Sequence, residues 1–472
     1  MVILNERYPL ASEYLRAQLG CAAGIDATVH PNDEMCIAGG ELDAQDPDNV
    51  LTLYLRNGFE MCTTVEQIAR WRFGALDRAS VLLDFASGYG RLTRFLVHKL
   101  PAERITVSDV VGEAVEFQVA QFGVAGITSA TDPDAFECDR RFDFIFAASL
   151  FTHLPAATFR RWLERLLSLL TPRGVLVFST HSAETFDWST GMPAPEGRDF
   201  FFVPLACSRV LDPHDYGNTF ITETALRALA GGRSLLRIPR GLSNGQDLCV
   251  LTPERDCDFS ELVYDTGVFG TPDAVRLSGT TLSLAGWIAT RSRRCPIRNV
   301  RIEAGGCRVA ELTSLAERPD VAAYWGDETY LHSGWSCSID LRDLAVSLDD
   351  LLVVKATTES GIEWVQYVGT VGAAAVRIRF AAAIDENRRR SEAGLRAQQA
   401  LDRAMVERLD GANAHAAELE ERVRLLAAGN ARLHATIAAM EASRFWKARE
   451  EWFRLKQRWA AHQSFEHRRA KR

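Results

Sequence analysis

Residues 81–90, Val-Leu-Leu-Asp-Phe-Ala-Ser-Gly-Tyr-Gly, constrain the fold more than any other part of this sequence. Three apolar residues predict a buried strand, and Asp84 closes it. A turn of small residues follows, and residues 91–96 open a helix. In a strand–glycine loop–helix unit, backbone N–H groups and the helix N-terminus face a ligand. The loop lacks both the Gly-x-Gly-x-x-Gly pattern and the Gly-Lys-Ser/Thr of a P-loop.

Further strand-like runs follow at regular intervals, and most of them end in an acid or a histidine. A helical pattern over residues 157–170 and a Pro-Arg-Gly stop separate the last two runs. Strands that alternate with helices predict a parallel sheet with right-handed crossovers. The runs are residues 104–109, 126–132, 142–147 and 175–181.

This ordered series resembles the class I S-adenosylmethionine (SAM) methyltransferases. Asp84 followed by Ala86, Gly88 and Gly90 at alternate positions is similar to their motif I, although that family usually has Gly where Ala86 stands. The resemblance implies an α/β fold with a Rossmann-like seven-stranded sheet and SAM as the cofactor. It also implies that Asp84 anchors the amino-acid end of SAM and that the two glycines let the backbone approach it.

Two later acids are further candidates for binding the cofactor. Asp109 lies 19 residues beyond Gly90, close to the ~20-residue spacing at which an acid after the second strand reaches ribose hydroxyls. Asp132 is a candidate for the adenine amino group. Each of these acids could instead cap a helix at the end of its strand.

Two histidines follow strands at the edge where ligands bind in such sheets, His153 after the fourth strand and His181 after the fifth. Either imidazole could take a proton from a sugar hydroxyl near neutral pH. The alternatives are that these histidines only hold loops, or that methyl transfer proceeds by proximity without a dedicated base.

The composition narrows the class of protein. A length of 472 residues allows about three domains. The net charge of −8 argues against a nucleic-acid partner, although residues 441–472 alone carry +6. Ten cysteines without a C-x-x-C pair predict free thiols and no metal site. We find neither a signal peptide nor a membrane span, so we expect a cytoplasmic protein.

The chain divides by pattern into five parts. Residues 1–78 predict a helical lid that borders the substrate cleft, and residues 79–255 the SAM domain. Short β-rich runs over residues 262–372 predict an antiparallel sandwich. Its Gly-Trp pairs, which contain Trp287 and Trp335, resemble an Ig-like module of bacterial glycan-assembly enzymes. These tryptophans are either core aromatics or platforms for sugars.

Residues 386–443 form a heptad array that predicts a parallel coiled-coil dimer, with Asn430 fixing its register. An intramolecular helical hairpin is the alternative. The a positions are Leu409, Ala416, Val423, Asn430 and Ile437, and the d positions are Met405, Ala412, Leu419, Leu426, Leu433 and Met440.

Residues 444–472 form a basic tail in which Phe445, Trp452 and Trp459 recur every seven residues. This amphipathic pattern is typical of a helix lying on an anionic membrane surface. A helix that docks on a protein partner such as a glycosyltransferase explains it equally well. A similar ending follows coiled coils in bacterial polysaccharide glycosyltransferases.

Together these features predict a dimeric, cytoplasmic SAM-dependent methyltransferase. We expect an O-methyltransferase, which the tail can bring to the inner face of the cell membrane. The expected acceptor is a hydroxyl of a surface polysaccharide or of its lipid-linked precursor, a glycan or glycolipid. One alternative is an enzyme that methylates a small metabolite and is oligomerised by its C-terminus. Another is a catalytically inactive scaffold of a glycan-assembly complex.

Overall fold

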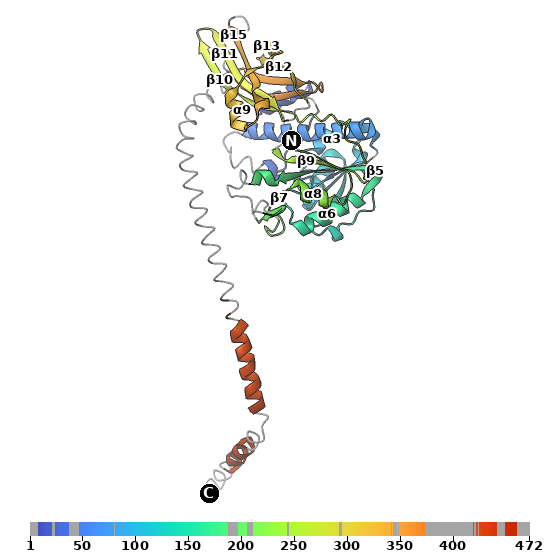
Figure 1. Ribbon diagram of the computed structural model, residues 1–472, viewed down its shortest axis with the longest axis vertical. Helices are drawn as coiled ribbons and strands as arrows, with labels where there is room; N and C mark the ends of the chain where they lie inside the picture. Colours follow the sequence, from blue (N-terminus) through green and yellow to red (C-terminus); the bar gives the residue numbers. More distant parts are fainter. Residues whose placement is uncertain are drawn as a thin grey trace, which may run out of the picture. The chain divides into compact units, whose positions relative to one another are not determined.

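The structure is a computed structural model that divides the chain into two units, residues 1–384 and 385–472 (Figure 1). Each unit is described by itself. The described residues are 8–20, 24–36, 47–79, 81–186, 197–204, 211–242, 245–291, 295–340, 342, 347, 349–372, 419, 422, 424–440 and 449–459.

The first unit contains a mixed sheet whose main run of strands is parallel, as predicted for a Rossmann-like fold. Five parallel strands lie in the order β3-β2-β1-β4-β5, β9 pairs antiparallel with β5, and β8 pairs antiparallel with β9. These strands are β1 (Leu82–Phe85), β2 (Ile105–Asp109), β3 (Ala125–Thr128), β4 (Phe142–Ala147), β5 (Leu170–Ser182), β8 (Leu235–Ile238) and β9 (Asp247–Leu251).

Seven strands form this main sheet, as expected, and two further strands bring the total to nine in the described part of the chain. The two additional strands, β6 (Phe200–Val203) and β7 (Asn218–Ile221), form an antiparallel hairpin. Strand β7 pairs with the last two residues of β5. The hairpin therefore pairs with the end of β5 that projects beyond the main sheet. Aromatic side chains of the hairpin pack with Phe186 in a small core.

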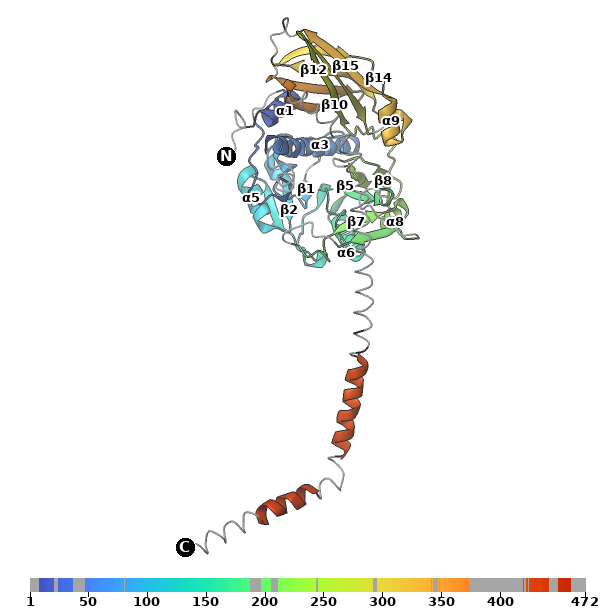
Figure 2. The same cartoon turned by 90° about the vertical axis from the view of Figure 1, so that its left-hand side faces the viewer.

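Helices cover both faces of this sheet (Figures 1 and 2). One face packs in a core with α1 and α3, and the other packs in a core with α6. The α-helices around the sheet are α1 (Pro9–Leu19), α3 (Pro47–Phe73), α4 (Thr93–Leu96), α5 (Gly112–Phe122), α6 (Ala156–Ser168) and α8 (Glu223–Leu229). Single 3-10 turns are η1 (Leu76–Arg78), η2 (Ala102–Arg104), η3 (Pro133–Ala135) and η4 (Ala183–Thr185).

Two antiparallel four-stranded sheets follow in the same unit, with the orders β10-β11-β15-β14 and β13-β12-β16-β17. Buried side chains from both sheets form one hydrophobic core. Trp335 is only 2% exposed and belongs to that core, whereas Trp287 is half-buried. The strands are β10 (Val268–Ser278), β11 (Thr281–Thr290), β12 (Ile297–Ala304), β13 (Cys307–Leu312), β14 (Ala316–Glu317), β15 (His332–Asp340), β16 (Leu351–Thr358) and β17 (Glu363–Thr370), with α9 (Pro319–Trp325) and η6 (Glu328–Tyr330) before β15.

The paired sheets pack directly against α1 and α3. Val353 and Val365 lie in the same core cluster as Leu15 and Leu55 of these helices. The Arg56 guanidinium, on α3, donates to the backbone carbonyls of Val268 and Gln366 at 3.1 Å each. The two parts of this unit therefore share one apolar core.

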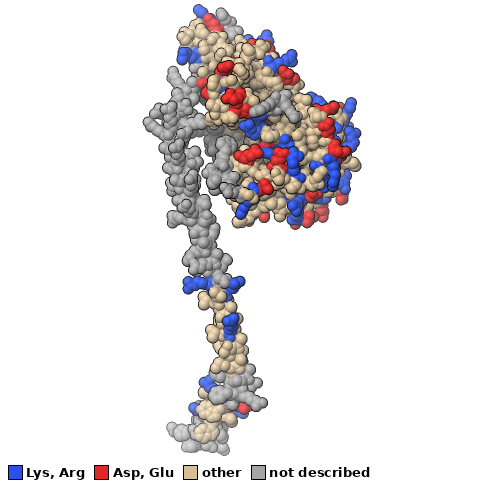
Figure 3. Space-filling view, viewed as in Figure 1, with Lys and Arg blue, Asp and Glu red and all other residues tan. Residues whose placement is uncertain are grey.

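In the second unit, residues 424–440 and 449–459 are helical. Most of the proposed coiled coil, including positions 405–418, lies outside the described residues, as does Phe445. Within the described ranges, no helix combines the length and the apolarity needed to cross a bilayer. Acidic and basic side chains are interspersed over the visible face of the first unit (Figure 3).

Candidate cofactor and acceptor site

Parallel pairing brings the carboxyl ends of β1, β2, β4 and β5 to one edge of the sheet, and the β8–β9 hairpin loop lies at the same edge. The non-glycine residues with left-handed backbone conformations in the described chain all lie here: Ala86 (φ 57°), Ser149 (φ 58°) and Arg240 (φ 51°). Such conformations persist only where the surroundings hold them. They cluster at functional sites, so this edge is the candidate site.

The glycine loop after β1 uses its two glycines differently. A Cβ on Gly88, whose φ is 54°, would meet no atom within 4 Å, so its backbone faces open space that a ligand can approach. A Cβ on Gly90 would come within 2.6 Å of the Phe122 ring and 3.0 Å of the Gln118 side chain. Gly90 therefore permits close packing of the loop against α5.

Two of the predicted acids lie beside this loop. Asp84 is 3% exposed and accepts a hydrogen bond from the Thr93 hydroxyl at 3.1 Å. Burial raises the pKa of Asp84 to about 7, and the neighbouring Asp109 carboxylate adds to that rise. Asp109 accepts hydrogen bonds from the backbone N–H groups of Gly88 at 2.8 Å and Val111 at 2.9 Å. Burial also raises the pKa of Asp109.

The structure thus brings Asp84, Ala86, Gly88, Gly90 and Asp109 together. It places Asp132 elsewhere, on the exposed surface, where 56% of the side chain is accessible.

Asp132 caps the η3 turn, accepting a hydrogen bond from the Asp134 backbone N–H at 3.0 Å, and it forms an ion pair with Arg161. This is the strand-end cap that the sequence left open as an alternative.

A buried arginine that the sequence analysis missed fixes the glycine loop to the N-terminal segment. Arg94 is fully buried, and its guanidinium donates to the backbone carbonyls of Gly90 at 3.0 Å and Tyr89 at 3.4 Å. The same group donates to the carbonyls of Asp26 at 2.7 Å and Thr28 at 3.1 Å. The sequence offers little signal for this role, because Arg94 is one of two arginines in the helical segment of residues 91–96.

Aromatic side chains complete this contact. The His30 ring stacks on the Tyr89 ring with centroids 4.6 Å apart, and the Tyr89 hydroxyl donates to Glu113 at 2.9 Å. The Tyr54 hydroxyl, on α3, donates to the buried Asp33 carboxylate at 2.7 Å. The N-terminal segment therefore borders the loop that we expect to hold a cofactor.

The two predicted histidines lie close together at the ends of β4 and β5. Their ring centroids are 6.3 Å apart, and the His153 ring stacks on Tyr216 at 4.6 Å. The His153 Nδ1–H donates to the Gly217 carbonyl at 2.6 Å. Burial lowers the pKa of His153 and lowers that of His181 to about 4, with a further contribution from the nearby His153. Both rings are therefore neutral at pH 7.

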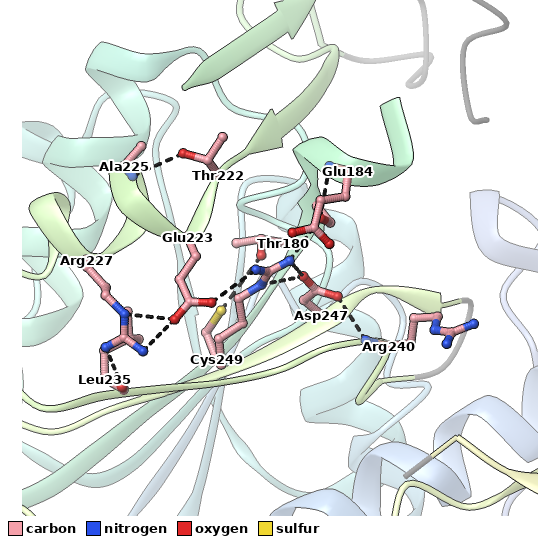
Figure 4. A network of polar contacts seen from close by, with 12 residues as sticks. Thr180, Glu184, Thr222, Glu223, Ala225, Arg227, Leu235, Arg240, Asp247 and Cys249 are labelled. Carbon is pink, nitrogen blue, oxygen red and sulfur yellow. Dashed lines mark hydrogen bonds and ion pairs between the residues drawn. The ribbon is translucent and has the colours of Figure 1, made fainter. Parts of the chain in front are cut away.

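A buried ion pair that the sequence did not reveal fixes the β8–β9 hairpin loop (Figure 4). The Arg237 Nε–H donates to Asp247 Oδ2 at 2.6 Å, and these side chains are 6% and 3% exposed. The same guanidinium donates to Ser182 Oγ, at the end of β5, at 2.9 Å. Asp247 Oδ1 accepts the Arg240 backbone N–H at 2.8 Å. This network ties the loop to the end of β5.

Residues 83–176, which contain the glycine loop and His153 and end before His181, match the family described as a methyltransferase domain. No curated protein matches the sequence.

Solved methyltransferase structures are similar at low identity. The DhpI complex with S-adenosylhomocysteine (SAH) is 20% identical and covers 48% of this chain and 100% of its own, with a TM-score of 0.30. The N-methyltransferase NodS from Bradyrhizobium japonicum WM9 is 20% identical and covers 41% of this chain and 92% of its own, with a TM-score of 0.28. An O-methyltransferase family protein from Burkholderia thailandensis is 15% identical and covers 53% of this chain and 68% of its own, with a TM-score of 0.32.

TM-scores of this size are too low to support an assignment, which therefore rests on the family match over residues 83–176. The chain contains a methyltransferase domain and is a SAM-dependent methyltransferase.

Proposed function

We propose that this enzyme transfers the methyl group of SAM to a hydroxyl of a surface polysaccharide or of its lipid-linked precursor. The observation that carries the choice of a hydroxyl is the neutral, oriented His153 at the carboxyl end of the sheet. A hydroxyl must lose its proton when it is methylated, so a positioned base assists this reaction.

The residues around the glycine loop fit the cofactor, whose sulfonium supplies an electrophilic methyl group. Asp84 is a buried carboxylate beside that loop, and an ammonium group nearby would stabilise its charged form. The open space at Gly88 allows close approach, and Asp109 can accept hydrogen bonds from ribose hydroxyls. Asp132 would have to leave Arg161 to reach an adenine amino group, so its role is the least supported.

His153 is the preferred base of the two histidines. Because its Nδ1–H donates to the Gly217 carbonyl, the basic lone pair is on Nε2. His181, with a pKa near 4, binds a proton more weakly at neutral pH and suits a role in contacting the acceptor. The proton of the acceptor hydroxyl would pass to His153 Nε2 as the oxygen bonds to the methyl group, while the methyl–sulfur bond breaks and SAH leaves.

The described helix of residues 424–440 supports a parallel coiled-coil dimer. Leu426, Leu433 and Met440 at d positions are 71%, 63% and 56% exposed in the single chain, and Ile437 at an a position is 49% exposed. Such a stripe is covered when a second helix packs along it. Asn430 at an a position would fix the register.

The tail supports a location at an anionic membrane surface. Trp452, Phe453 and Trp459 are 57%, 44% and 69% exposed, and the Lys456 ammonium lies 5.1 Å from the Trp452 ring centroid. Exposed aromatic rings beside basic groups suit the headgroup region on the inner face of the cell membrane. We interpret the paired sheets of the first unit as an Ig-like sandwich.

The test compares cell-surface glycans and glycolipids, by mass spectrometry, from cells that make the enzyme and cells that lack it. We expect one methyl ether on a sugar residue to disappear when the enzyme is absent and to be strongly reduced with His153→Gln. His181→Gln is the matched control and should retain more activity. Unchanged glycans together with a changed small-molecule profile would show that the acceptor is a metabolite.

A further inference from the structure

An arginine at the carboxyl edge of the methyltransferase sheet lies beside an exposed aromatic pair on the paired sheets. The Arg240 guanidinium carbon is 6.0 Å from the Trp325 ring centroid. Tyr324 and Trp325, the last two residues of α9, are 64% and 38% exposed. Figure 2 shows α9 next to β8, whose following loop carries Arg240. None of these three residues has a role in the proposed chemistry.

The position of Arg240 is held firmly. Its backbone is left-handed, with φ 51°, and its N–H is bound by the buried Asp247 carboxylate. Figure 4 shows its side chain directed away from that network. The guanidinium is half-buried and makes no hydrogen bond or ion pair with the described residues. A fixed backbone therefore presents a guanidinium whose donors have no carboxylate partner in that part of the chain.

Packing contacts also hold the aromatic pair, Tyr324 and Trp325, in place. The Trp325 ring meets the Phe269 ring edge to face, with centroids 5.5 Å apart and an interplanar angle of 87°. The Tyr324 ring stands perpendicular to Trp325 at 5.3 Å. Beneath them Tyr330 is 4% exposed and packs with Val321. This packing orders exposed rings before any ligand arrives, which lowers the entropy lost on binding.

We propose that Arg240, Tyr324 and Trp325 form a subsite for an anionic sugar unit of the acceptor, next to the unit that is methylated. A guanidinium binds a carboxylate through two parallel hydrogen bonds. The apolar C–H face of a sugar ring stacks on an aromatic ring. Tyr and Trp suit such contacts, because each combines an apolar ring with a polar O–H or N–H group. The proposal rests on the proposed glycan substrate and narrows it to acidic chains.

The loop that carries Arg240 also contacts the ends of β4 and β5, where the histidines lie. Gln246, the residue before Asp247, accepts a hydrogen bond from the hydroxyl of the strained Ser149 at 3.1 Å. The Arg237 guanidinium links Asp247 to Ser182, which follows His181 in the chain. One loop thus joins the end of β4, the end of β5 and Arg240. An acceptor chain lying along this loop would contact both the histidines and α9.

Calorimetry on the full-length protein saturated with SAH tests this subsite. The probes are uronate oligosaccharides of matched length from alginate, pectate and hyaluronate, with a dextran fragment as the neutral control. We expect at least one uronate to bind more tightly than dextran and to lose affinity as salt increases. Arg240→Gln should weaken it by about tenfold or more, the effect of losing a charge-assisted pair of hydrogen bonds.

Tyr324→Ala should weaken the same probe as well, whereas Arg308→Gln, which removes an exposed arginine from β13, should not. SAM affinity should be unchanged in all three variants. If no uronate binds, or if Arg240→Gln or Tyr324→Ala binds it as the unaltered protein does, the subsite is wrong. Failure of the unaltered protein to bind SAM would instead refute the proposed function.

Discussion

Replacing Arg94 by methionine tests whether this buried guanidinium holds the cofactor loop. Methionine has a similar length and fills much of the same volume, but it donates no hydrogen bond. The variant would leave the carbonyls of Gly90, Asp26 and Thr28 without this donor, in a place where the arginine itself is fully buried. It would also remove the cation 5.0 Å from the Tyr54 ring centroid.

The size of the effect follows from those contacts. A hydrogen bond from a charged donor contributes ~1.5–3 kcal/mol, and removing one partner of a buried charged network costs ~3–5 kcal/mol in all. The separate contributions do not add, so we expect Arg94→Met to lower the free energy of unfolding by about 3–5 kcal/mol. The total free energy of unfolding of a domain is ~5–15 kcal/mol, so the variant should still fold at low temperature.

Urea denaturation followed by circular dichroism measures this loss, and calorimetry with SAM measures the second consequence. Binding should weaken, because the carbonyls of Tyr89 and Gly90 lose their anchor on the N-terminal segment. Arg16→Met is the matched control, since the Arg16 side chain is 44% exposed and pairs only across one helical turn; we expect it to change stability by less than about 0.5 kcal/mol. A loss below ~1 kcal/mol for Arg94→Met, with unchanged SAM affinity, would refute the reasoning.

Four further predictions concern the cofactor, the pH dependence, assembly and membrane binding. Asp109→Ala should weaken SAM binding by ~1.5–3 kcal/mol in calorimetry, the contribution of charge-assisted hydrogen bonds, and undiminished affinity would remove Asp109 from the site. Burial raises the pKa of Asp84 from 3.8 to about 7, so the folded state without SAM holds this proton more tightly than the unfolded state does. Stability should therefore fall as pH rises from about 4 to 7, by up to ~1.4 kcal/mol per pH unit; Asp84→Asn should remove this component, and an identical pH profile would contradict it. Light scattering should give a dimer for the full chain and a monomer for a chain ending at Thr370, and a full-length monomer at micromolar concentration would exclude the coiled coil as a dimer interface. Flotation with anionic vesicles at low salt should require the residues after Met440, and equal flotation without them would exclude the tail as the membrane contact.

The local features of the site could be predicted from the sequence, and the long-range ones could not. The loop at residues 86–90 and the acids at the ends of β1 and β2 follow from a strand, a turn and a fixed spacing. Arg94, in contrast, has its role because it donates hydrogen bonds to carbonyls more than 60 residues away in the chain. No pattern within a helix specifies such partners.

Asp132 shows the opposite difficulty, because the local sequence allowed two roles. A strand-end acid can cap a turn or bind a ligand, and the structure shows the cap. The pairing of the β6–β7 hairpin with β5 could not be predicted for a related reason. The Phe-rich run of β6 carries no signal that its hairpin would pair with the end of β5 rather than lie apart.

The core that α1 and α3 share with the paired sheets also has a consequence for how the protein is made. On α3 the Phe59 ring packs against Trp364 with centroids 5.9 Å apart, and Val365 lies in the same core cluster as Leu55. These partners leave the ribosome roughly 300 residues after the helix. At a synthesis rate of ~5–20 residues per second, the apolar face of α3 stays exposed for on the order of 15–60 s before its packing partners are synthesised. During that interval the nascent chain exposes surface that a ribosome-bound chaperone would have to shield.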